Sequence, residues 1–132
     1  MKYILLAALV CIAIHFEPGY AQAQAAISPL SLVGKWSASE QRADGTVVKT
    51  DLTLTQTLRF SGTATVQGKE FWSYSGSWQV ADGRLIWHYE NSSRPLPESA
   101  KTDIDDIISV DSRKLVLASH LSGKQHVYLR SR

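Results

Sequence analysis

The feature that most constrains the fold of this chain is an alternation of apolar and polar residues with a period of two. In residues 52–60, Leu52, Leu54, Leu58 and Phe60 share one parity, and threonines and an arginine occupy most of the other. Such alternation is typical of a β-strand with one face in a core and one face in water. After residue 26 no stretch keeps the 3.6-residue apolar period of a helix for three turns. We therefore predict an all-β fold.

Turn-forming pairs that end in glycine divide this pattern into about eight strands. They lie at 44–45, 61–62, 67–68, 82–83 and 122–123. We expect strands at residues 34–40, 46–60, 63–67, 70–80, 84–91, 103–110, 114–120 and 124–130. Because no insertion of helix length separates them, neighbouring strands should pair antiparallel in an up-and-down meander. The one long loop is 91–102, which contains two prolines and should cross an end of the sheet.

Turn chemistry also predicts the register of three hairpins. Asp-Gly favours a two-residue turn, so Asp82-Gly83 should pair Trp78 with Trp87 and Gly76 with Tyr89. The same hairpin pairs Val80 with Leu85. Three-residue loops are expected at 61–63 and around Gly123. They would pair Phe60 with Ala64, Leu58 with Val66, Leu117 with Val127 and Leu115 with Leu129.

The N-terminal segment has the layout of a secretory signal peptide. Lys2 precedes an apolar run from Ile4 to Ile14, and small residues at 21, 23 and 25 form A-x-A cleavage patterns. The run is shorter than the roughly 20 residues that a membrane-spanning helix needs. We predict a signal peptide over 1–23, a single domain over 24–132, no membrane span after cleavage, and a secreted or periplasmic protein. Cys11, the sole cysteine, would leave with the signal.

Charge and motifs argue against several function classes. The chain has 14 Lys and Arg against 12 Asp and Glu, and they are scattered, so we expect no nucleic-acid partner. Asp103, Asp105 and Asp106 lack the spacing of a metal site and read as a solvated strand face, and no cofactor is indicated. No G-x-S-x-G motif is present. An enzyme would need a His–carboxylate pair that the spacing does not suggest, so we expect a protein without catalytic activity.

Three residues carry a resemblance to a known family. Gly34 and Trp36 form a G-x-W motif at the start of the first strand, and Arg130 ends the last strand. This arrangement resembles the lipocalin-like, or calycin-type, β-barrels, and in particular small bacterial members. The resemblance implies a small lipocalin-like barrel in which the tryptophan closes one end and the arginine packs over its ring. These residues would then be structural and would not contact a ligand.

Aromatic side chains supply the candidate binding site. The predicted face of the 70–91 hairpin carries Trp72, Tyr74, Trp78, Trp87 and Tyr89, which would either fill the barrel or line a cavity for a small apolar or amphipathic ligand. Gln56 falls on the leucine face and would orient that ligand, and the 91–102 loop would cover the mouth. The alternative is a solid barrel that binds a protein partner through loops or an edge strand, with contacts from Phe71 and the 91–102 loop. The volume of the barrel interior distinguishes the two hypotheses.

Overall fold

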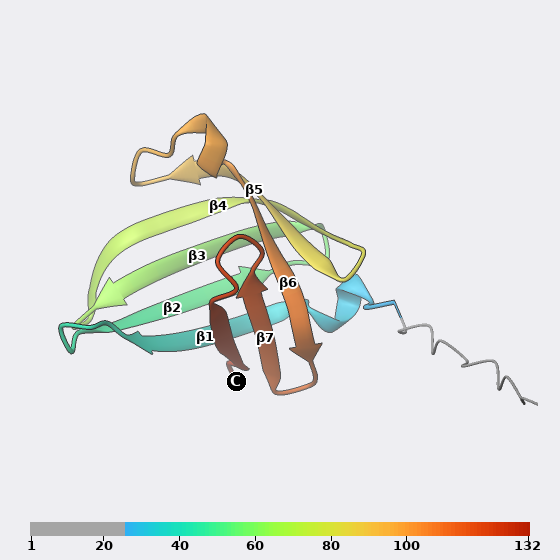
Figure 1. The fold of residues 1–132 in the computed structure, drawn as a ribbon, viewed down its shortest axis with the longest axis horizontal. Helices are drawn as coiled ribbons and strands as arrows, with labels where there is room; N and C mark the ends of the chain where they lie inside the picture. The colour runs from blue at the N-terminus through green and yellow to red at the C-terminus, as the bar shows by residue number, and fades with distance from the viewer. Residues whose placement is uncertain (1–25) are drawn as a thin grey trace, which may run out of the picture.

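The computed structural model describes residues 26–132, which form a closed antiparallel β-barrel of eight strands in sequence order (Figure 1). The predicted signal peptide, 1–23, lies outside the described residues. The strands are β1 (Gly34–Gln41), β2 (Val47–Leu54), β3 (Arg59–Val66), β4 (Lys69–Ala81), β5 (Arg84–Ser92), β6 (Thr102–Val110), β7 (Lys114–Ser119) and β8 (Gln125–Arg130). Two short 3₁₀ helices, η1 (Pro29–Ser31) and η2 (Glu98–Ala100), lie outside the barrel wall, and neither is long and apolar enough to cross a membrane. The predicted fold class is confirmed.

The two ends of the barrel differ in their connections. One end, the mouth end, holds the turns at 42–46 and 67–68 and the loops at 93–101 and 120–124. The other end, the floor end, holds η1 and the turns at 55–58, 82–83 and 111–113. Figure 1 shows the 93–101 connection rising above the end of β5 and η1 lying beside the opposite end. Longer connections gather at the mouth end, so a site there can be built from both strands and loops.

The β4–β5 hairpin has the predicted register. Trp78 pairs with Trp87, Val80 with Leu85, and Gly76 with Tyr89. Asp82 and Gly83 both have positive φ, at 53° and 72°, as a two-residue type I′ turn requires. The hairpin therefore directs its aromatic residues to the barrel interior, and Trp78 is 1% exposed.

The β2–β3 hairpin differs from the prediction. The turn lies at 55–58 and pairs Leu54 with Phe60, whereas Gly62 is in the middle of β3. The predicted pairing of Phe60 with Ala64 is therefore wrong. The reason is steric: Gly62 serves as a close-packing site for the Tyr74 ring, because a Cβ there would lie 2.3–2.5 Å from three atoms of that side chain. A consequence is that Gln56 sits exposed in the turn and not on the inner face.

The β7–β8 hairpin is also shifted from the predicted register. Leu117 pairs with His126 and Val116 with Val127, and the N–H of Ser119 donates to the carbonyl of Lys124 at 2.9 Å to close the loop. Gly123 has the expected left-handed conformation, with φ of 71°, but the loop is longer than three residues. Val127 and Leu129 therefore face outward, and Tyr128 faces the barrel interior.

The floor end is closed by the three residues of the G-x-W and arginine pattern. Trp36 is 1% exposed, and its Nε1 donates to the carbonyl of Leu32 at 2.8 Å. The guanidinium of Arg130 lies 4.1 Å from the centre of the Trp36 ring. Gly34 permits this approach, because a Cβ there would lie 2.3 Å from Nη1 of Arg130. Fully buried leucines continue the packing above the ring, namely Leu54, Leu85, Leu115 and Leu117.

Candidate functional site

The mouth end of the barrel contains a cavity of about 310 Å³, here called the mouth cavity. This volume is at the lower limit for small-molecule sites. Residues of every strand except β3, and of the β7–β8 loop, line it: Ala38, Glu40, Thr50, Leu52, Trp72, Tyr74, Trp87, Tyr89, Asp103, Asp105, Ser119, Ser122, His126 and Tyr128. The barrel is thus solid at the floor end and hollow at the mouth end.

A group of contacting aromatic rings forms one wall of the mouth cavity. The centres of the Trp72 and Tyr74 rings are 4.3 Å apart, and those of Tyr74 and Tyr89 are 5.6 Å apart. Phe60 continues the group into the core, where its ring meets Tyr89 edge-on at 5.2 Å. Such tilted and edge-on contacts are favourable for aromatic rings. The wall is therefore held by the core and is not an isolated surface patch.

Local contacts fix the outermost ring of this wall. Nε1 of Trp72 donates to Oγ of Ser92 at 2.8 Å, and that hydroxyl donates to the carbonyl of Arg94 at 2.6 Å. The indole N–H is satisfied by these contacts, so the apolar body of Trp72 remains available to the cavity.

Two carboxylates from β6 enter the mouth cavity on the side of Trp87. Asp103 and Asp105 have the same parity as the buried Ile107, and they pair with Trp87 and Leu85 of β5. Nε1 of Trp87 donates to Oδ2 of Asp105 at 2.7 Å. Burial raises the pKa of the Asp105 carboxyl, as do the neighbouring charges of Asp103 and Asp106, and the Trp87 hydrogen bond offsets only part of this. The prediction of a solvated strand face is therefore wrong for Asp105, which is half-buried on the inner face, whereas Asp103 lies at the mouth and stays exposed.

A third carboxylate belongs to a pair with histidine that bridges β1 and β8. Glu40 contacts Nδ1 of His126, and Nζ of Lys124 lies 3.5 Å from its other oxygen. Partial burial raises the pKa of the Glu40 carboxyl, but the hydrogen bonds and positive charges of His126 and Lys124 outweigh burial, so the net pKa is lowered. Backbone pairing between β1 and β8 covers only Trp36 with Arg130 and Ser37 with Leu129. These side chains therefore join the two strands beyond their paired residues.

Three phenol groups face the mouth cavity without a partner in the described part of the chain. No protein atom there hydrogen-bonds to the hydroxyls of Tyr74, Tyr89 or Tyr128, yet no polar side-chain atom is fully buried and unsatisfied. The hydroxyls are therefore accessible, and Tyr74 also lines a groove on the outer face beside Gly62. Burial raises the pKa of Tyr74 to about 12, and it also raises the pKa values of Tyr89 and Tyr128. All three phenols stay neutral at physiological pH and can donate or accept a hydrogen bond.

The structure brings together four of the six predicted ligand-binding residues. Trp72, Tyr74, Trp87 and Tyr89 line the mouth cavity. Trp78 does not: it lies in the core, where its Nε1 donates to the carbonyl of Arg59 at 3.1 Å. Gln56 lies in the exposed β2–β3 turn at the floor end, so it is not at the site. The long loop also fails to cover the cavity, because no described residue between Ser93 and Lys101 lines it.

Sequence reasoning missed Glu40, Asp103, Asp105, His126 and Tyr128. The alternation of Asp103 and Asp105 around Ile104 was visible, but the side of the sheet that each faces depends on the β5–β6 register. His126 and Tyr128 depended on the β7–β8 register. The available signal was that Asp103 and Asp105 are spaced two residues apart and share the parity of the apolar Ile107 on the same strand.

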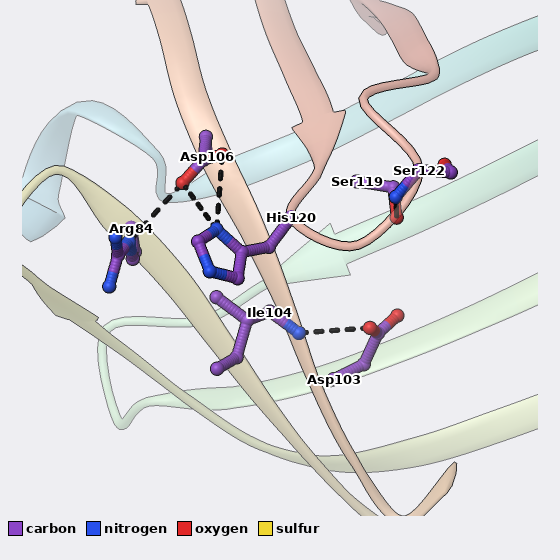
Figure 2. Close-up of polar contacts among 7 residues, drawn as sticks. All are labelled: Arg84, Asp103, Ile104, Asp106, Ser119, His120 and Ser122. Carbon is purple, nitrogen blue, oxygen red and sulfur yellow. Dashed lines mark hydrogen bonds and ion pairs between the residues drawn. The ribbon is translucent and has the colours of Figure 1, made fainter.

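A second His–carboxylate pair lies outside the barrel (Figure 2). Nδ1 of His120 is 3.2 Å from Oδ1 of Asp106, and Nε of Arg84 is 3.3 Å from the same oxygen. Figure 2 shows Ser119 at the end of β7 and Ser122 in the β7–β8 loop, away from this pair. At the mouth cavity, neither serine hydroxyl hydrogen-bonds to His126 among the described residues. The expectation that spacing brings no histidine to a carboxylate is wrong, but within residues 26–132 no serine or threonine hydroxyl hydrogen-bonds to either histidine.

Comparison with other proteins adds no assignment to this geometry. No model of a known protein family matches the chain, and no curated protein matches it. Within residues 26–132, no three His, Cys, Asp or Glu side chains are grouped closely enough to hold a metal ion. Functional inference therefore depends on the mouth cavity itself.

Proposed function

We propose that this protein is an exported, non-catalytic binding protein that holds a small amphipathic molecule in the mouth cavity. The observation that carries the proposal is the division of the barrel into a packed floor and a hollow, aromatic-lined mouth. The rings of Trp72, Tyr74 and Tyr89 would supply apolar contact, and the carboxylates and phenols would orient polar groups. Export is proposed from the signal-like segment at 1–23.

Kinship with the lipocalin-like barrels is part of this proposal. The closed eight-stranded meander is compatible with that fold. The stacking of Arg130 on Trp36 beside Gly34 supports the kinship, because it uses all three residues of the sequence resemblance. Ligand binding inside the barrel would then be a shared property, with the ligand held at the end opposite this closure.

Native mass spectrometry of the protein purified from its own host tests the proposed function. A bound molecule would add mass that disappears on denaturation. In parallel, the neutral fluorophore N-phenyl-1-naphthylamine should bind the purified protein, and Trp72→Leu should weaken that binding. Phe71→Leu is the matched control, because Phe71 lies between Arg42 and Arg94 and does not line the mouth cavity. A bare mass together with no uptake of the fluorophore would contradict the proposal.

A second candidate function is binding of another protein on the outside of β6–β8. Ile108, Val127 and Leu129 are exposed there, at 54%, 47% and 58%, and Val116 lies beside Val127. The short pairing between β1 and β8 also leaves part of each strand edge unpaired in the barrel. Sedimentation velocity of wild type and Val127→Lys tests self-association through this face. If the wild-type protein is monomeric at all concentrations tested, self-association through this face is excluded.

A further inference from the structure

We infer that the ligand of the mouth cavity is an organic cation, an amine or quaternary ammonium group attached to an apolar body. This inference rests on the proposed binding function and specifies the chemical class of the ligand. It follows from three independent features of the cavity: the sign of its charge, the absence of cations from its aromatic rings, and its unpartnered phenols.

The charge of the cavity is opposite to that of the chain. The whole sequence has a net charge of +2. Among the described residues, however, the lining contains Glu40, Asp103 and Asp105, one histidine, His126, which pairs with Glu40, and neither lysine nor arginine. Because Glu40 is paired, the two β6 carboxylates set the sign of the charge, and they favour a positive ligand over a neutral or negative one.

Among the described residues, the two β6 carboxylates in the cavity have no lysine or arginine partner, unlike Glu90 and Asp106 on the outer surface. In the described residues, Arg59 pairs with Glu90 at 2.6 Å and Arg84 with Asp106 at 3.3 Å. Asp103 accepts a hydrogen bond from the N–H of Ile104, and Asp105 accepts one from Trp87. Figure 2 shows this contrast on one strand, where Asp106 meets Arg84 and His120 while Asp103 meets only a backbone N–H.

The aromatic rings of the cavity are likewise free of the protein's own cations. Elsewhere in residues 26–132, Arg130 lies over Trp36, and Arg42 and Arg94 lie over Phe71. No arginine or lysine of these described residues lies over Trp72, Tyr74 or Tyr89. Electron-rich ring faces beside carboxylates are the surroundings that alkylammonium groups prefer in proteins.

The remaining polar groups favour an organic cation over a metal ion. The phenols of Tyr74, Tyr89 and Tyr128 can accept N–H bonds from an ammonium group, and the rings around them contact its methylene or methyl groups. By contrast, no three metal-ligating side chains of the described chain are grouped as a metal requires. The aromatic rings in the wall would also have no role around a hydrated metal ion.

Two probes of the same shape test the sign of the charge. Benzyltrimethylammonium and neopentylbenzene differ only in a cationic nitrogen in place of a carbon. We expect the intact exported protein to bind the cation at least about tenfold more tightly, measured by tryptophan fluorescence and calorimetry. Asp103→Asn combined with Asp105→Asn should remove most of that advantage and leave binding of neopentylbenzene unchanged. Asp106→Asn is the matched control on the outer face of β6, and it should change neither affinity.

The outcomes separate this inference from the proposed function. If neopentylbenzene binds as tightly as the cation, or if only N-phenyl-1-naphthylamine binds, the cation inference is overturned and ligand binding stands. If none of the three probes binds, both are overturned. If the cation binds preferentially but the double variant keeps the full preference, the carboxylates of β6 do not provide the selectivity, and the inference is again overturned.

Discussion

The side chain of Arg130 combines three hydrogen bonds to backbone carbonyls with a cation–π contact. Its guanidinium donates to the carbonyls of Ser112, Val33 and Ser31 at 2.9, 2.8 and 3.1 Å and lies over the Trp36 ring. A lysine keeps the charge but cannot reach three carbonyls from one planar group. We expect Arg130→Lys to lower the free energy of unfolding by about 1–3 kcal/mol in urea titration. Arg84→Lys, at an exposed ion pair, should cost under about 0.5 kcal/mol. Equal effects of the two variants would show that the guanidinium of Arg130 does not stabilise the floor end of the barrel.

Two aspartates should affect stability with opposite dependence on pH. The pKa of Asp105 is raised by burial, so the folded state binds its proton more tightly than the unfolded state. Stability from this group therefore falls as pH rises through the window between its ordinary pKa and its raised pKa, and it stays lower above that window. Asp105→Asn should stabilise the protein at pH 7, and the gain should vanish below the ordinary pKa. The groups that face Asp105 are Asp103, Asp106, His126 and Trp87, and they are unchanged in this variant.

Asp111 provides the opposite case. Its Oδ1 accepts the N–H groups of Arg113 and Lys114, both at 2.7 Å, and these hydrogen bonds lower its pKa. The contribution of Asp111 to the stability of the fold is present above its ordinary pKa and is lost as pH falls through its lowered pKa in the folded protein. Asp111→Ala should therefore be destabilising at pH 7 and less so in acid. Urea titrations of both variants at pH 3 and 7 check the two signs, and slopes of the same sign would contradict this assignment.

At the scale of the element, the register of a hairpin could be predicted from the sequence only where the turn residues identify the turn. The Asp82-Gly83 hairpin was predictable because turn residues, strand propensity and cross-strand pairs agree on one register. The β2–β3 turn has no glycine, and Leu58 adopts the positive φ of 60° that such a turn needs. Gly62 is the stronger turn signal in the sequence, but in the structure it lies within β3 and leaves room for the Tyr74 ring. The error came from a glycine selected for packing in three dimensions, which no local pattern reports.

The strained turn residue gives a direct test of this account. Leu58 is 42% exposed and has a left-handed backbone conformation, which asparagine adopts at a lower free-energy cost than leucine. Leu58→Asn should raise the free energy of unfolding by about 0.5–1 kcal/mol, since the strain falls and little burial is lost. Leu121→Asn, at a leucine that is 95% exposed without positive φ, should be neutral. Thermal and urea unfolding compare the two, and a destabilised Leu58→Asn would mean that the leucine contributes packing.

At the scale of the whole molecule, the aromatic face predicted from the sequence serves both ends of the barrel. The sequence placed Trp72, Tyr74, Trp78, Trp87 and Tyr89 on one face but could not divide them between core and cavity. That division depends on how far each residue lies from the floor, which follows from barrel closure. The carboxylates were missed for the same reason, because Asp103 and Asp105 become interior residues only when β5 and β6 pair.

This division predicts that stability and binding are separable along one strand. Trp78 is 1% exposed and packs in the core, so Trp78→Leu should cost about 2–4 kcal/mol of unfolding free energy through the cavity that it leaves. Trp72 is half-buried at the mouth, and Trp72→Leu should cost about 1 kcal/mol while greatly weakening uptake of N-phenyl-1-naphthylamine. Both substitutions remove an indole from β4, one from the packed floor end and the other from the mouth. Urea titration and fluorophore binding on the same samples measure the two effects. If Trp78→Leu weakened binding while the protein remained folded, or Trp72→Leu left it intact, the hollow end of this barrel would not be where its ligand binds.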